Sequence, residues 1–403
     1  MRILQLCKKF PYPLKDGESV AVHAMSRGYV KNGCKVGLLA LNTSKHFVQF
    51  HELPEAMSHF SFVESIFIDT SVNPIHAFFN LFTDKSYNIE RFDLDRFHQK
   101  LKVVIDEFKP DIVQIESLYM VPYIASIRKY CNAFISMRSH NLEFEIWQDL
   151  AKGSKNPLKK WYFNLCAKRL KKYETENFGM YDTLIPISES DYNKYQQLKY
   201  KGPFCVSPVG LDTSRYSSEY TTSKSSLRLG YIGSLDWIPN IEGVSWFFEN
   251  AWSLIKEKYP HVEFHLAGRN ASENFKNTLP SNVNFHGEVG NAVDFIAGLD
   301  AVIVPLFSGS GIRVKILESM AMGKIVLSTY KGFEGIGVED GKNGFVFDSS
   351  NDIIHAIETC INDVPRRKTI QKEALMLVRE KFDFSVLAKR TIDHYNQLLN
   401  QRE

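Results

Sequence analysis

The stretch Val304–Ser328, VPLFSGSGIRVKILESMAMGKIVLS, predicts a strand, a glycine-rich turn, a helix and a second strand in succession. The apolar residues in its middle recur at helical spacing. Gly323 stands where such a helix would stop. A helix between two strands is the repeating unit of a parallel α/β sheet. The stretch therefore predicts a parallel sheet in the second half of the chain.

Two cations lie in the first turn of this predicted helix. Arg313 and Lys315 stand where the helix dipole is already positive, at a cost of about 0.3–1 kcal/mol each. A bound anion would reverse that sign, and the open N–H groups of a glycine-opened helix favour phosphate. Glu318 lies on the same helix face as Lys315. This set suits a phosphate beside a sugar hydroxyl; the alternative is a Lys315–Glu318 surface pair of about 0.2–0.5 kcal/mol.

The whole chain has the composition of a globular protein of two or three domains, with 403 residues and a net charge of +3. That charge does not suggest a nucleic-acid partner. The six cysteines are scattered, without a Cys-x-x-Cys pair, which argues against a disulfide framework or a zinc site. The apolar run at the start of the sequence is too short for a signal peptide. No apolar run approaches the 18 residues that a membrane-spanning helix needs. We expect a cytoplasmic enzyme.

The first half of the chain also opens with a strand, a helix and a strand, and the strands cover Ile3–Leu6 and Val36–Leu41. Ligands of parallel sheets bind at the carboxyl ends of strands. Gly17, in the loop after the first strand, could let the backbone approach a ligand, or could be an ordinary turn glycine. His140 follows a predicted strand at Ala133–Met137. It could bind a substrate hydroxyl or stabilise developing charge, or it could be structural.

Two further segments carry motifs with competing interpretations. Asp93 and Asp95 match the Asp-x-Asp metal motif of some sugar transferases, but their charged helical surroundings favour a solvated helix face and no metal site. The stretch Lys152–Lys172 holds eight lysines and arginines, no acid, and several aromatic residues. It is typical of an interfacial helix on anionic lipid. The alternative is a helix that packs on its own domain with its lysines in water.

The polar run at 217–226 predicts an inter-domain connection, after which strands and helices alternate again from Leu227. We expect a helix over Glu242–Ile255 and a final helix over Phe384–Leu399. The fold class is α/β, with two Rossmann-like domains whose parallel sheets face a central cleft.

The ordered motifs together resemble the retaining glycosyltransferases of family 4, which have the GT-B fold. The similarity spans most of the chain, although each motif alone is weak. The motifs are the Gly17 loop, Pro110-Asp111, His140, Ile187-Ser-Glu189, Val209–Asp212, Tyr231-Ile-Gly233, Leu266-Ala-Gly268 and Gly311–Gly323.

The resemblance implies transfer of a sugar from a nucleotide-diphosphate sugar, with retention, no metal and no further cofactor. It implies an acceptor-binding domain at 1–212, a donor-binding domain at 213–380, and a helix at 381–403 that crosses back to the first domain. His140, Arg313 and Lys315 would be catalytic, with His140 contacting the donor sugar. The residues expected to bind the donor are Gly17, Gly233, Asn240, Gly309, Ser310, Gly311, Ile312 and Glu318, the last at the ribose.

Two departures from the family pattern affect the donor site. Ser310 stands where the family often has a second glutamate, eight residues before Glu318. Ser234 and Asn240 stand where the family commonly has an arginine and a lysine that hold the diphosphate. Because a diphosphate needs compensating charge, we infer that Arg313 and Lys315 replace the missing pair.

The expected acceptor is a glycan or a lipid-linked molecule, in cell-surface polysaccharide or glycolipid assembly, with the protein peripheral on the inner face of the cytoplasmic membrane. Without a placed carboxylate nucleophile, front-face attack is favoured, and the leaving phosphate takes the acceptor's proton. Two other functions stay open: a GT-B nucleotide-sugar epimerase, and a non-catalytic nucleotide-sugar-binding or scaffold protein.

Overall fold

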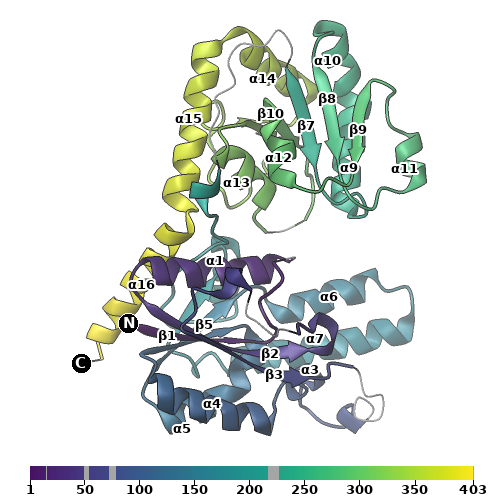
Figure 1. The fold of residues 1–403 in the computed structure, drawn as a ribbon. Helices are drawn as coiled ribbons and strands as arrows, with labels where there is room; N and C mark the ends of the chain where they lie inside the picture. Colours follow the sequence, from purple (N-terminus) through teal and green to yellow (C-terminus); the bar gives the residue numbers. More distant parts are fainter. Residues whose placement is uncertain (15, 50–53, 72–78, 217–226, 310, 403) are drawn as a thin grey trace. The chain divides into compact units, whose positions relative to one another are not determined.

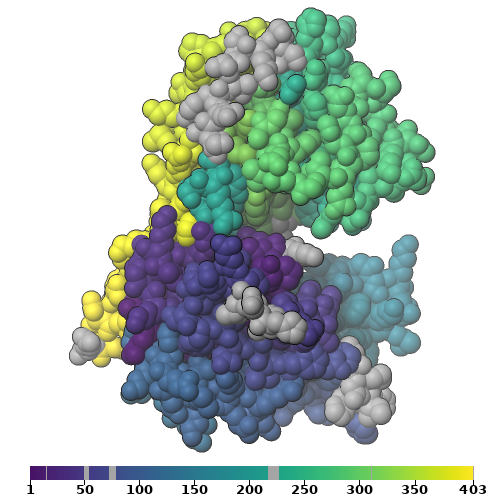
Figure 2. Space-filling view, viewed as in Figure 1, coloured from purple at the N-terminus to yellow at the C-terminus, as the bar shows by residue number. Residues whose placement is uncertain are grey.

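The computed structural model describes residues 1–14, 16–49, 54–71, 79–216, 227–309 and 311–402. The chain divides into two compact units (Figures 1 and 2). Unit 1 comprises Met1–Gly210 together with Phe384–Glu403, and unit 2 comprises Leu211–Asp383. The polar run at 217–226 and Ser310 lie outside the described residues.

Unit 1 is built on a six-stranded parallel sheet with strand order β3-β2-β1-β4-β5-β6 (Figure 1). Strand order reverses between β1 and β4, so their carboxyl ends are where ligands of such sheets bind. The strands are β1 (Arg2–Cys7), β2 (Lys35–Thr43), β3 (Phe62–Ile68), β4 (Ile112–Glu116), β5 (Phe134–Ser139) and β6 (Thr183–Pro186).

Alternate residues of β1 face two different apolar cores, because successive side chains of a strand point to opposite faces. Leu4 and Leu6 belong to one core, and Ile3 and Cys7 belong to the other. The helices of this unit are α1 (Gly17–Lys31), α3 (Tyr87–Glu90), α4 (Asp95–Phe108), α5 (Ile124–Tyr130), α6 (Glu143–Gly153), α7 (Pro157–Glu176), α8 (Glu189–Gln197) and α16 (Phe384–Asn400). Shorter turns are η1 (Ser44–His46), η2 (Glu55–Met57) and η3 (Leu118–Tyr123).

The last helix, α16, packs against α1 within unit 1 (Figure 1). The two backbones approach closely at Gly28, where an added Cβ would lie 2.5 Å from the carbonyl oxygen of Phe384. Any larger residue at this position would push the helices apart.

Unit 2 repeats the architecture with a parallel sheet of order β12-β11-β10-β7-β8-β9. The prediction of two parallel α/β sheets is therefore confirmed. The strands are β7 (Arg228–Ile232), β8 (Glu263–Ala267), β9 (Val283–Gly287), β10 (Ala301–Val304), β11 (Ile325–Ser328) and β12 (Phe345–Val346). The helices are α9 (Ile238–Phe247), α10 (Ser253–Lys258), α11 (Glu273–Asn277), α12 (Ala292–Ala297), α13 (Val314–Ala321), α14 (Ser350–Asn362) and α15 (Val364–Lys381), with η4 (Thr213–Arg215) and a π-turn, η5 (Phe248–Trp252).

Three details differ from the sequence expectations. The helix expected from Glu242 already begins at Ile238, because Pro239 occupies its first turn, a position that proline favours. Asn240 is therefore helical. The helix α15 was not expected. Asp93 precedes α4 instead of lying in it, and its Oδ1 lies 2.8 Å from His98 Nε2.

The basic stretch Lys152–Lys172 is not one helix. Its first residues are the last residues of α6, and most of the others belong to α7. Asn156 caps the start of α7 by accepting hydrogen bonds from two backbone N–H groups. Of the helices in the described part of the chain, none combines the length and apolarity that a membrane span requires.

Candidate functional site

His140 directly follows β5, at the carboxyl edge of the sheet in unit 1. The residue is only 6% exposed. Its Nε2 lies 2.8 Å from Oε2 of Glu116, the last residue of β4. A histidine and a carboxylate therefore lie within hydrogen-bond distance at the ends of two neighbouring strands.

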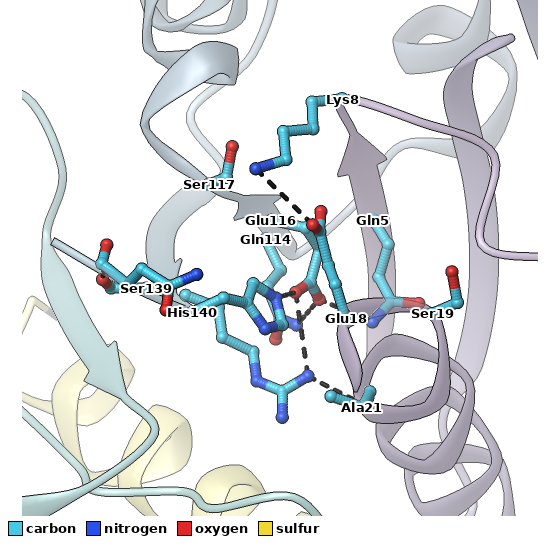
Figure 3. A network of polar contacts seen from close by, with 12 residues as sticks. Gln5, Lys8, Glu18, Ser19, Ala21, Gln114, Glu116, Ser117, Ser139 and His140 are labelled. Atoms are coloured by element: carbon cyan, nitrogen blue, oxygen red, sulfur yellow. Dashed lines mark hydrogen bonds and ion pairs between the residues drawn. The ribbon is translucent and has the colours of Figure 1, made fainter. Parts of the chain in front are cut away.

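Glu116 is the centre of a buried polar network (Figure 3). It has no exposed surface, and it accepts hydrogen bonds from Gln5 Nε2 at 3.1 Å and from Gln114 Nε2. The fully buried Arg138 places NH1 at 3.7 Å from Glu116 Oε2 and donates from the same nitrogen to the carbonyl oxygen of Ala21 at 3.0 Å. A buried carboxylate is tolerated here because charged and polar donors surround it.

These neighbours keep Glu116 ionised. Burial alone would raise the pKa of Glu116, but Arg138 and the hydrogen bond from His140 bring it below its ordinary value. An ionised carboxylate can only accept, so His140 donates from Nε2–H. The Nδ1 atom of His140 has no hydrogen-bond partner among the described residues, and the fixed ring leaves this atom to a ligand.

The network continues from Glu116 to the C-terminal helix. Gln114 donates to Glu116 and accepts at Oε1 from the hydroxyl groups of Tyr29, at 2.6 Å, and Tyr395, at 2.8 Å. Tyr395 belongs to α16, and its hydroxyl also lies 2.8 Å from Ser136 Oγ. The orientation of His140 is thus tied to a residue 255 positions later in the chain.

A cluster of charges surrounds the end of β1 in the same unit. Lys8 Nζ lies 3.1 Å from Glu143 Oε1. It also lies 3.5 Å from Glu18 Oε2 (Figure 3). Lys9 Nζ lies 2.7 Å from Asp16 Oδ1 and 3.6 Å from Glu18 Oε2. The pKa of Lys8 is raised: burial lowers it, but Glu143 and Glu18 more than offset that effect.

Gly17, the first residue of α1, lies beside these charges. It has no positive φ, and an added Cβ would meet no atom within 4 Å. Neither the backbone nor the packing of the described residues therefore requires glycine here.

In unit 2, the cations of the opening stretch lie at the start of α13. Arg313 is the N-cap residue and makes no capping bond with its side chain, and Lys315 is in the first turn. Gly309 and Gly311, in the preceding turn, have φ of 94° and 85°, which only glycine adopts without strain. Ile312 is half-buried between this turn and the helix.

Lys315 is held by neutral oxygen atoms. Its Nζ donates to Tyr231 Oη at 2.8 Å, to the carbonyl oxygen of Ile232 at 3.0 Å, and more weakly to Asn240 Oδ1 at 3.5 Å. No ion pair joins Lys315 to a carboxylate within the described part of the chain, so the Lys315–Glu318 pair considered above does not form. Burial, reinforced by Arg313, lowers the pKa of Lys315 to about 7.

The ammonium of Lys315 lies beside Gly233 and Asn240. An added Cβ on Gly233 would come within 2.9 Å of Lys315 Nζ and 3.0 Å of Asn240 Nδ2. Asn240, only 4% exposed, donates to the carbonyl oxygen of Ser234 at 2.8 Å. Lys315 thus places a positive charge beside Gly233, where the side chains of Ser234 and Asn240 are uncharged.

Arg313 and Glu318 complete the predicted group in unit 2. The guanidinium carbon of Arg313 lies 5.6 Å from the ring centre of Trp237, and burial lowers the pKa of Arg313. Glu318 accepts from Tyr216 Oη at 3.2 Å, and burial raises its pKa. Two cations and one carboxylate therefore lie along one short helix.

Three residues that contact the predicted site residues were not identified from the sequence. Glu116 is a strand residue of ordinary appearance, and Tyr231 was noted only as part of a glycine motif. Arg269 follows β8 and donates from Nε to Ser234 Oγ at 3.1 Å, which adds a third cation near Gly233. The position of Arg269 after a strand end was the one signal that could have identified it.

Comparisons with known proteins bear on the family and the fold of the chain. Residues 226–363 match the family described as Glycosyl transferases group 1. An uncharacterized 44.6 kDa protein in the cps region of Klebsiella pneumoniae is 22% identical over 262 residues. That match covers 61% of this chain and 64% of the relative, which is less than two thirds of the relative's length.

Solved structures of low sequence identity share the fold over the whole chain. The structure of Anabaena HepE in complex with UDP has 16% identity and a TM-score of 0.61, covering 98% of this chain and 100% of that one. Sucrose-phosphate synthase from Thermosynechococcus elongatus has 14% identity and a TM-score of 0.66, covering 100% of both chains. The fold is GT-B. Residues 226–363 within this fold carry the match to the group 1 glycosyl transferases.

Proposed function

We propose that this protein is a retaining glycosyltransferase that moves a sugar from a nucleotide-diphosphate sugar to an acceptor. Unit 2 holds the donor and unit 1 holds the acceptor. The observation that carries the proposal is Lys315, a half-buried cation beside Arg313 that no carboxylate neutralises among the described residues.

The electrostatic argument favours a strongly anionic ligand. A lysine in these surroundings loses part of its protonation, which is the response of a cation without a counter-charge. A diphosphate supplies that counter-charge, and the first N–H groups of α13 are further donors at the same end of the helix. Glu318, one turn further along α13, suits hydroxyl groups of the attached ribose.

In the proposed reaction, the bond between the anomeric carbon and the diphosphate breaks as the acceptor hydroxyl forms its new bond on the same face. Arg313, Lys315 and the amides of α13 stabilise charge on the leaving diphosphate, which takes the proton of the hydroxyl. His140, fixed through Nε2 by Glu116, offers Nδ1 to a sugar hydroxyl group. The reaction proposed here needs neither a metal nor a further cofactor.

The relatives support a setting for this reaction. The Klebsiella relative is described by its place in a cps region, and HepE was crystallised with UDP and with UDP-glucose. We therefore propose a glycan or lipid-linked acceptor in cell-surface polysaccharide or glycolipid assembly, at the cytoplasmic side of the membrane. No nucleic-acid partner is proposed.

A thermal-shift screen of nucleotide-diphosphate sugars tests the donor, and the best donor is then incubated with glycan and lipid-linked acceptors. Transfer that keeps the anomeric configuration supports the proposal. An epimer formed from the donor alone would identify an epimerase instead. Tight binding without transfer or hydrolysis over a broad acceptor panel would identify a binding or scaffold protein.

A further inference from the structure

The helices α6 and α7 form an antiparallel hairpin that extends from the sheet of unit 1, with residues 154–156 at its outer end (Figures 1 and 2). The two helices hold each other partly through Trp147 and Phe163, whose ring centres are 5.7 Å apart. Further along α7, buried residues such as Leu170 join the core of the unit. The hairpin therefore projects from the unit as a packed pair of helices, and its inner end is part of the hydrophobic core.

Large apolar side chains are exposed near the outer end of this hairpin. Leu158 is 76% exposed and Trp161 is 57% exposed, and their spacing places them on one face of α7. Ile146 and Leu150, one turn apart on α6, are 43% and 48% exposed. Exposed apolar residues gathered on one projecting element, and not scattered singly, mark an interaction surface.

The charge of the same region is strongly positive. Residues 149–164 contain four lysines and one acid, Asp149, which pairs with Lys152 at 2.9 Å. The other three lysines, Lys155, Lys159 and Lys160, are exposed and form no ion pair with any described residue. The outer end of the hairpin thus combines apolar anchors with uncompensated cations.

We propose that the outer end of the α6–α7 hairpin, residues 149–164, binds the surface of an anionic phospholipid bilayer. Leu158 and Trp161 enter the boundary between headgroups and acyl chains, and Lys155, Lys159 and Lys160 contact lipid phosphates. Tryptophan and lysine are the residues that favour this boundary. A projecting hairpin end reaches a bilayer more readily than it fills the groove of an acidic protein. This inference does not depend on the donor chemistry of unit 2.

Co-sedimentation of the full chain with vesicles tests the proposal. We expect binding to phosphatidylcholine vesicles that carry about one third phosphatidylglycerol, and weak binding to phosphatidylcholine alone. Replacing Lys155, Lys159 and Lys160 by serine should lower the partition coefficient by roughly fivefold per lysine, and added salt should do the same to the wild type. Replacing Leu158 and Trp161 by serine should lower it at least about tenfold.

Matched variants elsewhere in the chain control for lost charge and lost apolar surface. Lys368→Ser with Lys372→Ser removes exposed cations from α15, and Leu254→Ser removes a side chain of α10 that is 45% exposed. These controls should bind vesicles like the wild type, and thermal midpoints should show that all variants fold. Absence of wild-type binding, or equal binding by the Leu158/Trp161 variant, would overturn the proposal. Binding to polyglutamate as tight as to vesicles would point to an acidic protein instead.

Discussion

The ammonium nitrogen of Lys315 lies 2.8 Å from the hydroxyl oxygen of Tyr231 and 4.0 Å from the centre of the same ring. A phenol and its π face attract a cation without neutralising it. Burial can therefore lower the pKa of Lys315 to about 7, so that the site holds a proton only part of the time at neutral pH. The proposed binding of a diphosphate at Lys315 should therefore depend on pH.

Donor binding should draw a proton into the protein above pH 7. A bound diphosphate raises the pKa of Lys315, so affinity should fall as pH rises through about 7, the value in the free protein. Calorimetric titration at pH 8, in buffers of different ionisation enthalpy, should report uptake of about 0.9 proton, against about 0.1 at pH 6. In Lys315→Met this uptake should vanish; uptake that persists would assign the proton to another group.

Removing either cation of α13 should slow the reaction strongly. Arg313→Ala and Lys315→Ala should each lower kcat by roughly 100-fold, equivalent to about 2.7 kcal/mol of lost stabilisation of the leaving diphosphate. Initial rates with saturating donor and acceptor measure this. Lys368→Ala, which removes an exposed cation from α15, should keep wild-type turnover. Near-normal turnover in Arg313→Ala would contradict the proposed role.

Glu318→Gln should weaken nucleotide binding more than it slows turnover. A charge-assisted hydrogen bond to a ribose hydroxyl contributes about 1.5–3 kcal/mol, so Kd should rise by roughly 10- to 150-fold. Calorimetric titration with the best donor measures the change. The matched control is Glu257→Gln, an exposed carboxylate of α10. Unchanged affinity in Glu318→Gln would exclude this contact.

Glu116→Gln should destabilise unit 1, because it leaves Arg138 buried without its counter-charge. We expect a loss of about 3 kcal/mol. The lowered pKa of Glu116 stabilises the fold at pH values above 4.5, and this contribution is lost as the pH falls through the folded value. Thermal midpoints measured between pH 7 and pH 3 should therefore fall less steeply in Glu116→Gln. A parallel slope would mean that other carboxylates cause the acid sensitivity.

Local patterns were enough to predict the βαβ units and the helix that follows Gly311. The stretch from β10 through α13 to β11 has clear apolar strands, a glycine turn and a stop at Gly323, whose φ is 68°. The sequence also indicated His140 by its place after a strand. These features depend on residues that are close in the sequence, and hydrophobic periodicity reports only such local relationships.

The missed features depend on distant partners. β3 pairs with β2 as an edge strand of half-buried residues, so it lacks a strong apolar run. α15 buries polar residues such as Gln371, which weakens its amphipathic pattern. Glu116 receives its partners from positions up to 111 residues away, and Lys315 is held by Tyr231, 84 residues earlier. No local pattern encodes such pairings.

The placement of α16 in unit 1 also has a consequence for protein synthesis. The ribosome completes unit 2 before it releases the residues that finish unit 1. Until Tyr395 emerges, Gln114 and Ser136 lack their buried partner, and α1 lacks the helix that packs at Gly28. The first unit begun during translation is therefore the last to reach its final packing, and a released chain that ends at residue 383 should carry a complete unit 2 and an incomplete unit 1.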